Sequence, residues 1–543
     1  MNSFDFDLKV QNIFDKQFSN IPSTDWKKWL DISSKEEYED LCLRNSGLSS
    51  INDIFERIIK DKLNSKYLSV EPHSYLEKYQ GSKPLIVCHS SGTTNSDLTA
   101  LKWLPMSKNI IQQYWAPGIQ AISESSGLDR RSSAIIFIPS RIKIDGLQSY
   151  KGQTYISLYS VEFSQRLMLS IIKPQSYTFY EYKNYNNLDI ISKILHLDKI
   201  SVISAPALII LGWADLEKFQ RGIKRSLENL PKEKNSILED LLAIIRKVGI
   251  EKATQIIQAK LTEKFCKATL IFSTSSLSEQ NWLLIRKFMG WEKGKERFTN
   301  LYVASEIGTF AASISKGDFN LSRLNKMYVF PLTLPVLEYN NKRNLISRIS
   351  EQTGKLLVSK LGDSGPLVNI DIGDIITVKK SDGLPIIEGN IIRSSFELKY
   401  KVKLSDKVKK PYNYKVLAGD FFSFNNFNVI QPGNLLNCLK SSCKLKTDAL
   451  LLMQKSNKSW EFFLPSDLDS NCFNENQILD IISKCPNQKE LYQAFANNSV
   501  GINFIDDQPV DFLATRAEIL KMVREGQISK GILKKWPLYV IKL

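Results

Sequence analysis

Residues suited to nucleotide chemistry follow an apolar run at positions 84–89 of this 543-residue chain. The run leads into a hydroxyl-rich loop, which consists of Ser90, Ser91, Gly92, Thr93 and Thr94. Glycine lets the backbone approach a ligand, consecutive amides can form a concave anion site, and hydroxyl groups add donors without bulk. These properties suit a polyphosphate, although the GxxxxGK[ST] pattern of a Walker loop is absent. An ordinary strand-end turn is the alternative interpretation.

Carboxylates occupy two later turns, each next to an apolar stretch. Leu301–Ala304 leads into Ser305 and Glu306, and Asp374 follows Gly373. A carboxylate beside a triphosphate would hold Mg²⁺, a hard cation that takes oxygen ligands. Taken alone, Glu306 also fits an exposed loop residue with a structural role. The order of the loop and the two turns is what favours a shared function.

That order resembles the adenylate-forming superfamily, which includes acyl-CoA synthetases, luciferases and peptide-synthetase adenylation domains. Its phosphate-binding loop resembles residues 90–94, its Tyr-x-x-Ser/Thr-Glu motif resembles 302–306, and its Tyr-Arg-x-Gly-Asp motif resembles 370–374. The resemblance covers about residues 80–390. It implies that the hydroxyl-rich loop and Ser305 bind ATP, that Glu306 binds Mg²⁺, and that Asp374 accepts both ribose hydroxyls.

One branch of that superfamily, the acyl-acid amido synthetases that conjugate auxin or jasmonate to amino acids, gives the best match. Lys102–Ser107 and the strand that contains Glu338 resemble segments of this branch. Lys534-Lys535-Trp-Pro resembles its Tyr-Lys-x-Pro ending, so we expect Lys535 or Lys534 to be catalytic; a solvated basic tail is the alternative. A phenylacetate-CoA ligase-like protein is the second choice.

The resemblance implies activation of a small carboxylic acid as an acyl-adenylate, with release of pyrophosphate. The acyl group would then pass to an amine, with coenzyme A as the alternative acceptor. Lys102 and Arg393 are candidate nucleotide-binding cations; Arg393 either works from a shifted motif position or is a surface residue. Departures from the motifs at Asn95, Asn369 and Asp371 keep open a degenerate member that binds a nucleotide or a partner without catalysis.

Composition indicates a folded globular protein, because 43% of the residues are hydrophobic and 24% are charged. The formal charge of +16 suits an anionic ligand without selecting one. The polar start, the scattered cysteines and the absence of an apolar run near ~20 residues predict a cytoplasmic protein without a membrane span. Nucleic-acid binding through Lys399–Lys415 is disfavoured against a solvated β-hairpin. His89 is interpreted as a core or loop histidine.

Alternating strand and helix signals predict an α/β fold with parallel-type sheets. We expect a helical cap at 1–80, an adenylation core at 81–388 with a helical insert at 214–265, and a smaller, mobile α+β domain at 389–543. Predicted core strands include 85–87, 134–138, 201–204, 268–272 and 300–303. Residues 372–379 and 385–388 are predicted to form a hairpin through the Ser-Asp-Gly turn at 381–383.

Overall fold

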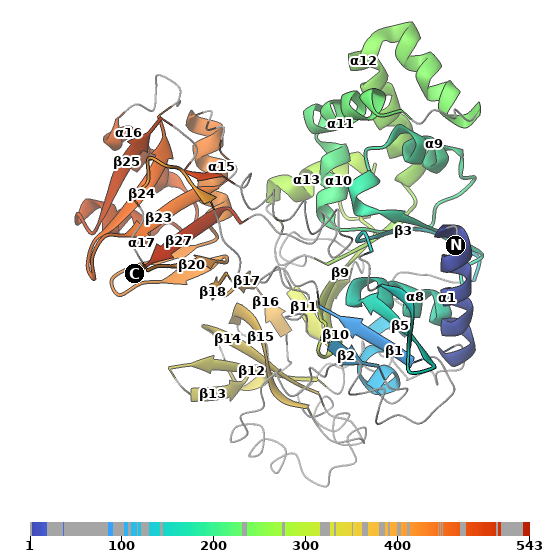
Figure 1. Ribbon diagram of the computed structural model, residues 1–543, viewed down its shortest axis with the longest axis horizontal. Helices are drawn as coiled ribbons and strands as arrows, with labels where there is room; N and C mark the ends of the chain where they lie inside the picture. Colours follow the sequence, from blue (N-terminus) through green and yellow to red (C-terminus); the bar gives the residue numbers. More distant parts are fainter. Residues whose placement is uncertain are drawn as a thin grey trace. The chain divides into compact units, whose positions relative to one another are not determined.

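The fold is seen in a computed structural model of the chain (Figure 1). The structure describes residues 3–18, 36, 85–90, 103–106, 110–116, 118–120, 130–141, 145–230, 236–273, 277, 279–314, 326–330, 333–340, 342–349, 351–360, 367–378, 386–388, 391–398, 403–409, 413–443, 445, 447, 449–466, 474–506, 509–511 and 536–543. The chain divides into two compact units, and each is described by itself. The first unit contains the described parts of 1–90, 102–372 and 376–390, and the second contains those of 373–375 and 391–543. The domain boundary near 389 and the hinge there remain predictions.

The first sheet of the first unit has the order β2-β1-β5-β4. Its strands are β1 (Leu85–His89), β2 (Trp103–Pro105), β4 (Gly146–Tyr150) and β5 (Gln153–Tyr159). β1 and β5 run parallel, while β2 and β4 are antiparallel to their neighbours. The run predicted at 85–87 is confirmed as a buried strand. The parallel pair brings the carboxyl ends of β1 and β5 to the same edge.

A larger sheet has the order β16-β11-β10-β9-β8-β7-β3-β6. Its strands are β3 (Ser133–Ile138), β6 (Ser176–Glu181), β7 (Val202–Ser204), β8 (Thr269–Phe272), β9 (Phe298–Ala304), β10 (Gly308–Ile314), β11 (Lys326–Val329) and β16 (Ile386–Glu388). From β6 to β9 the neighbours are parallel, and β10, β11 and β16 continue the sheet antiparallel. The predicted α/β fold with parallel strands is confirmed.

Helices pack on the larger sheet and on one another. They are α8 (Ser160–Ile172), α9 (Leu188–His196), α10 (Ala207–Ala214), α11 (Leu216–Glu228), α12 (Ser236–Phe265) and α13 (Glu279–Phe288). Helices are thus present at 216–228 and 236–265, inside the predicted insert, with non-helical backbone at Gly249. Leu238, Leu241 and Leu242 are buried there in the same cluster as Phe272 and Phe298. The insert therefore forms part of the core.

A third sheet has the order β13-β12-β14-β15, with β12 antiparallel to β13 and β14. Its strands are β12 (Thr333–Tyr339), β13 (Lys342–Leu345), β14 (Gln352–Lys360) and β15 (Leu367–Val378). The predicted hairpin of 372–379 with 385–388 is wrong, because β15 joins this sheet whereas β16 pairs with β11. The local turn signal did not reveal that β11 offers an edge to β16.

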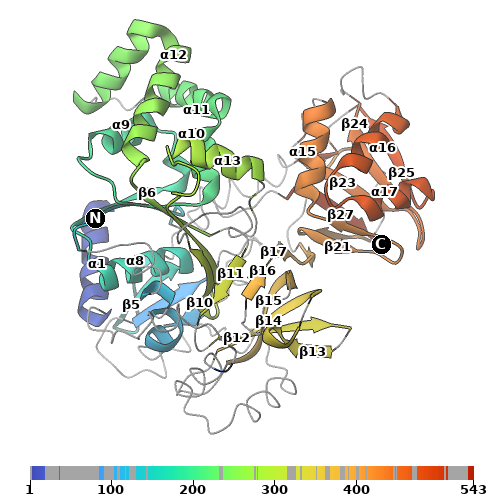
Figure 2. The same cartoon turned by 180° about the vertical axis from the view of Figure 1, so that it is seen from behind.

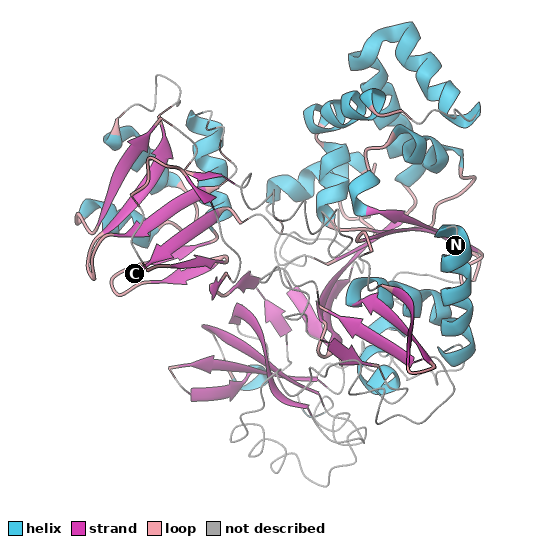
Figure 3. Ribbon diagram, viewed as in Figure 1, coloured by secondary structure: helices cyan, strands magenta, loops and turns pink. Residues whose placement is uncertain are grey.

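Six strands described in the second unit form a mixed sheet in the order β18-β20-β27-β23-β24-β25. Figure 3 shows these strands accompanied by α15, α16 and α17. The bounds are β18 (Phe396–Glu397), β20 (Lys415–Ala418), β23 (Leu450–Gln454), β24 (Trp460–Pro465), β25 (Val500–Ile505), β27 (Leu538–Lys542), α15 (Pro432–Cys443), α16 (Glu475–Lys484) and α17 (Lys489–Ala496). Shorter strands are β17 (Ile391–Arg393), β19 (Lys403–Leu404), β21 (Phe421–Ser423), β22 (Asn428–Ile430) and β26 (Val510–Asp511).

The basic stretch 399–415 does not form the hairpin that we favoured. β19 pairs with β26, and β20 pairs with β18 and β27, so the two strands join different sheets. Lys415 also forms an ion pair with Glu397 at 3.2 Å. Pairing with strands that are distant in sequence therefore organises this part of the chain. A local run of lysines and tyrosines does not reveal such pairing.

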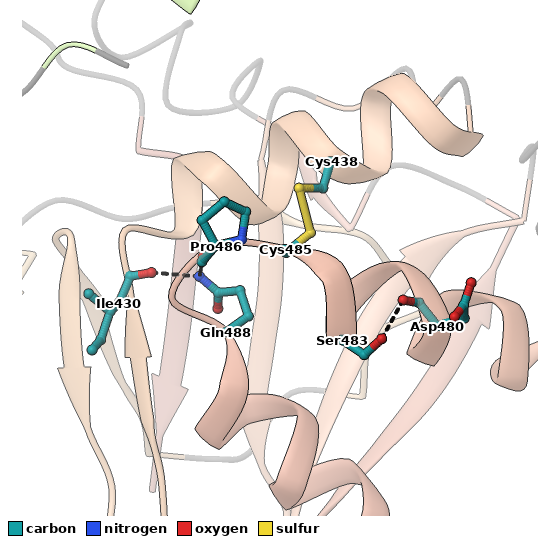
Figure 4. Close-up of a disulfide and its surroundings, with 7 residues drawn as sticks. All are labelled: Ile430, Cys438, Asp480, Ser483, Cys485, Pro486 and Gln488. Carbon is teal, nitrogen blue, oxygen red and sulfur yellow. Dashed lines mark hydrogen bonds between the residues drawn. A yellow bond between two sulfur atoms is a disulfide. The ribbon is translucent and has the colours of Figure 1, made fainter. Parts of the chain in front are cut away.

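A disulfide links Cys438 of α15 to Cys485, the residue that ends α16 (Figure 4). The sequence led us to expect reduced, unpaired cysteines, because the spacing shows no pattern typical of pairing. The two residues lie 47 positions apart, and only the packing of the two helices brings their Cα atoms to 6.3 Å. Nearby, the Gln488 side chain donates a hydrogen bond to the Ile430 carbonyl and ties the end of this segment to β22.

Helix α8 is central to the first unit because it packs against β1, β5 and β3 and against α1 (Ser3–Phe18). Both ribbon views show α1 alongside α8 (Figure 1, Figure 2). Arg166 of α8 is fully buried and pairs with the buried Glu162 and with Asp7 of α1. Arg141 binds the same two carboxylates. This network fixes α8 between its neighbours, since a buried charge without a partner would cost several kcal/mol. The other helices predicted within 1–80, at 34–43 and 52–63, lie outside the described residues apart from position 36.

Glu162→Gln should lower the stability of the first unit by about 3 kcal/mol at neutral pH, because Arg166 would lose a buried counter-charge. Burial alone would raise the pKa of Glu162, but Arg166 and Arg141 bring it below its usual value. The stabilisation is therefore present above the unfolded pKa and is lost as the pH falls through the folded pKa. Thermal unfolding from about pH 7 to about pH 3 should show the two proteins converging in acid.

The matched control for this prediction is Glu239→Gln, which removes a surface pair with Arg246 at 3.1 Å. That change should have little effect at any pH. Equal melting temperatures for wild type and Glu162→Gln at neutral pH would contradict the role of the network.

Candidate active site

The hydroxyl-rich loop begins where β1 ends. β1 is an apolar strand buried from Ile86 to His89, and Ser90 follows it. The other loop residues, Ser91, Gly92, Thr93 and Thr94, lie outside the described residues, as do Asn95 and Lys102. Ser90 is half-buried, and its carbonyl lies 2.9 Å from Nδ1 of His89. The start of the loop is therefore held by the strand that precedes it.

Ser160 follows the neighbouring strand β5 and is the first residue of α8. β1 and β5 are parallel and in register, with His89 opposite Tyr159, so Ser90 and Ser160 each follow one of these two paired residues. The Ser160 hydroxyl lies 2.8 Å from the Ser305 hydroxyl, which belongs to the turn between β9 and β10. The end of β5 and the Glu306 turn, far apart in sequence, thus contact each other within the first unit through Ser160 and Ser305.

Glu306 lies in the middle of a tight turn from β9 to β10, closed by a hydrogen bond from the Ile307 amide to the Ala304 carbonyl. The turn needs a glycine after it. Gly308 has φ +74°, and a Cβ there would lie 2.9 Å from Trp115 of the π-helix η3 (Ile111–Trp115). The Glu306 side chain itself is only half-buried. Backbone and packing therefore fix the turn, while the carboxylate keeps contact with solvent.

The donor set around Glu306 suits a magnesium ion that is shared with a nucleotide. No group of three His, Cys, Asp or Glu side chains in the described ranges could enclose a metal. Mg²⁺ is commonly held by one or two carboxylates plus phosphate oxygens and waters, and a protein cage is not needed. A single half-buried carboxylate fits that pattern. Glu306 would hold the ion, which would offset charge on the phosphates.

The Gly-Asp pair lies on the part of β15 that belongs to the second unit. Asp374 is buried, and one of its carboxylate oxygens lies 3.2 Å from Nε of Arg393. Gly373 has φ +79°, and a Cβ there would lie 2.5 Å from the Arg393 guanidinium. The Ser394 amide also donates to the Gly373 carbonyl. The structure thus brings Arg393 to Asp374, and the role of either residue in nucleotide binding stays a prediction.

Residues at the departures from the family motif have structural roles here. Asn369 is buried, has φ +50°, and donates its amide hydrogen to Ser359 Oγ at 2.9 Å. Asn is among the few residues other than glycine that adopt this left-handed backbone readily. Asp371 forms an ion pair with Lys355 of β14 at 2.6 Å. The Asn369 backbone and the Asp371 side chain therefore support the third sheet. Glu338, from the strand resembling the amido synthetases, is likewise paired with Arg343 at 2.8 Å.

Lys360, which the sequence gave no reason to select, lies behind the Glu306 turn. It is the last residue of β14, it is buried, and its Nζ lies 3.4 Å from the Thr309 carbonyl, next to Gly308. Among the described residues no carboxylate pairs with it, and burial lowers the pKa of Lys360 to about 7. Its amine is therefore close to half-protonated at neutral pH.

Comparisons with known proteins identify no family model and no curated protein that matches the chain. Among solved structures, the amide bond synthetase McbA from Marinactinospora thermotolerans is 10% identical, with a TM-score of 0.42 over 83% of this chain and 72% of that chain. A 2-hydroxyisobutyryl-CoA ligase with bound 2-HIB-AMP and CoA is 7% identical, with a TM-score of 0.44 over 99% and 92%. A structure from a study of fatty acyl-adenylate ligases from E. coli and L. pneumophila is 10% identical, with a TM-score of 0.40 over 78% and 67%. Identities of 7–10% and TM-scores of 0.40–0.44 are too low to carry an argument about the function of this chain.

None of the helices in the described ranges is both long and apolar enough to cross a membrane. Lys534 and Lys535 lie outside the described residues. The nearest described neighbour, Trp536, is buried against Phe396 in the core of the second unit. The predicted catalytic role of these lysines stays a prediction.

Lys360→Met should stabilise the protein below about pH 7, by on the order of 3 kcal/mol, because the wild type must bury a charged amine there. The folded pKa is lower than that of an exposed lysine, so this cost is full below about 7 and disappears as the pH rises through the unfolded pKa. Melting temperatures should therefore differ at about pH 6 and converge near pH 10. Lys355→Met, on the same strand but at the surface, is the control and should change little. A constant difference at all pH values would contradict the assignment.

Proposed function

We propose that this chain is an adenylate-forming ligase that activates a carboxylic acid with ATP and transfers the acyl group to an amine. The observation that carries the proposal is the 2.8 Å contact between Ser160 and Ser305. It links the Glu306 turn to the end of β5, whose parallel neighbour β1 leads into the hydroxyl-rich loop. Ser90, the first residue of that loop, and the Glu306 turn, whose carboxylate suits Mg²⁺, therefore both lie beside the end of β5 in the first unit.

In the first step, the carboxylate of the substrate attacks the α-phosphate of ATP and pyrophosphate leaves. The hydroxyl-rich loop would hold the β- and γ-phosphates, with Lys102 as a nearby cation. Glu306 would hold Mg²⁺, and Ser305 would be oriented by Ser160. Positioning and electrostatic stabilisation supply most of the rate enhancement in such phosphoryl-type transfers.

Asp374 would accept the ribose hydroxyls, because an ionised carboxylate can accept two O–H donors. Arg393 contacts one oxygen of this carboxylate through Nε at 3.2 Å, which holds the carboxylate in place. Lys535, or its neighbour Lys534, would offset the negative charge that develops as pyrophosphate leaves. This lysine assignment depends on the sequence resemblance alone.

In the second step, an amine attacks the acyl carbonyl of the adenylate, the C–O bond to AMP breaks, and the amine loses a proton. The likeness of Lys102–Ser107 to the amido synthetases supports amide formation. Coenzyme A, which would give a thioester, is the alternative acceptor. Amide and thioester formation can be distinguished in two stages. Pyrophosphate release from pooled carboxylic acids identifies the substrate, and mass analysis with amino acids or coenzyme A added identifies the product. A chain that binds MgATP without releasing pyrophosphate from any acid would instead be a degenerate member.

Glu306→Gln should reduce ATP–pyrophosphate exchange by about a hundredfold or more, because the amide is a poor ligand for the metal that bridges the phosphates. The exchange needs no acceptor, so it isolates the first step. Glu292→Gln is the matched control, since Glu292 is a surface residue of the same type paired with Lys295. Undiminished exchange in Glu306→Gln would defeat the metal assignment.

Asp374→Asn should raise the KM for ATP at least tenfold, because an amide accepts hydrogen bonds less strongly and loses the charge-assisted contacts. The effect should be much smaller with a 2′,3′-dideoxy analogue, which lacks both ribose hydroxyls. Asp371→Asn, on the same strand and paired with Lys355 at the surface, is the control and should leave the KM unchanged. Equal effects on ATP and on the analogue would remove Asp374 from the ribose site.

A further inference from the structure

A cavity of about 930 Å³ lies in the helical part of the first unit. It is bounded by the end of α9, by α12, and by the connections that lead into β7 and β8. Residues at 240–244 and 260–264 line it, from the two parts of α12 on either side of the non-helical Gly249. The ribbon views show α12 beside α9 (Figure 1, Figure 2). The volume falls within the range of pockets that hold small molecules.

The cavity and the Glu306 turn lie at opposite edges of the larger sheet. Ile200 and Lys267, which line the cavity, come just before the amino ends of β7 and β8. These strands run parallel to each other and to β9, and Glu306 follows the carboxyl end of β9. Substrates of open α/β sheets bind at the carboxyl ends of the strands. A ligand in the cavity would therefore occupy a second site, separate from the candidate active site.

The floor of the cavity is aliphatic. Ile200 and Leu241 are each only 3% exposed and belong to the core cluster of the helices and the larger sheet. Leu195 and Ile244 are partly buried and pack beside them. Covering such a surface with an alkyl chain removes apolar area from water, which is favourable in proportion to the area covered.

Lysine side chains surround this floor. They are Lys199, Lys260, Lys264 and Lys267. The Lys264 ammonium donates a hydrogen bond to the Leu197 carbonyl at the end of α9. In the part of the chain that the structure describes, none of the four lysines forms an ion pair with a carboxylate.

Acidic side chains also line the cavity, but they are fewer. Asp240 lies 3.4 Å from Nε2 of His196, whereas Asp198 and Glu263 are exposed to solvent. The four ammonium groups thus exceed the three carboxylates, and one of those carboxylates already faces an imidazole. The surplus of positive charge favours an anionic ligand, in a chain whose formal charge is +16.

We propose that this cavity binds an amphiphilic organic anion, with an aliphatic chain on the floor and a carboxylate head group among the lysines. Exposed pairs between an ammonium and a carboxylate contribute little by themselves. The aliphatic contact therefore supplies most of the affinity, and the lysines select the sign of the head group. The site stands apart from the proposed adenylation reaction and does not depend on it.

Cys266 gives a readout that is local to the cavity, because its partly buried side chain lines it and its thiol is free. The measurement is the rate at which iodoacetamide alkylates Cys266 in the full chain, followed by mass analysis of the peptide. Decanoate, kept below the concentration at which it forms micelles, should slow this rate about fivefold or more near saturation. Inorganic phosphate, which has charge without a chain, and decyltrimethylammonium, which has the opposite charge, should leave the rate unchanged.

Charge reversal at the lysines tests the head-group contact. In Lys260→Glu combined with Lys267→Glu, decanoate should slow alkylation by less than about twofold, because attraction becomes repulsion. Lys247→Glu combined with Lys252→Glu is the matched control, since these exposed residues of α12 lie outside the lining. Each rate is compared with that of the same variant without decanoate, so a change in the reactivity of the thiol itself cancels. Melting temperatures confirm that both variants are folded.

Three results would overturn the inference. The first is an unchanged alkylation rate of the wild type with decanoate. The second is equal protection by decanoate in the two double variants. The third is protection by phosphate or by decyltrimethylammonium that matches protection by decanoate. None of these measurements involves ATP, so their outcome is independent of the exchange assays that test the proposed function.

Discussion

The placement of helix α8 is the constraint on which the first unit depends. Its first residue, Ser160, touches the Glu306 turn, and the helix packs against β1 and β5 of the first sheet and β3 of the larger sheet. A fully buried arginine, Arg166, fixes the helix, because its guanidinium must remain next to Glu162 and Asp7. Because Ser160 is the first residue of α8, the buried ion pairs of Arg166 that fix this helix also fix where the Ser160 hydroxyl contacts Ser305.

The sequence was informative where local pattern and tertiary structure agree. The buried strands β1, β3, β7, β8 and β9 are short apolar runs that end in polar turns, and each was expected near its observed position. The sequence was uninformative where a strand pairs with another strand that is distant in the chain. The Ser-Asp-Gly turn at 381–383 favours a hairpin, but β16 pairs with β11, which lies far from it in sequence. The disulfide between Cys438 and Cys485 was missed for the same reason.

The residues of the candidate site fall into the same two groups: those that a local sequence pattern indicates and those that a distant contact places. Ser90, Glu306 and Asp374 could be selected because their residue types follow strands in a recognisable order. Ser160 and Lys360 could not, because each is placed by a contact between residues that are distant in sequence. Arg393 lies between these cases: the sequence left its role open, and the position of its Nε beside Asp374 favours participation.

The ion pair between Lys355 and Asp371 has a consequence for substitution at these two positions. An arginine in place of Asp371 would set two cations side by side across β14 and β15, and the nearby left-handed backbone at Asn369 is already committed to Ser359. A charge reversal at position 371 would therefore need a carboxylate at position 355, so the residue types at the two positions depend on each other.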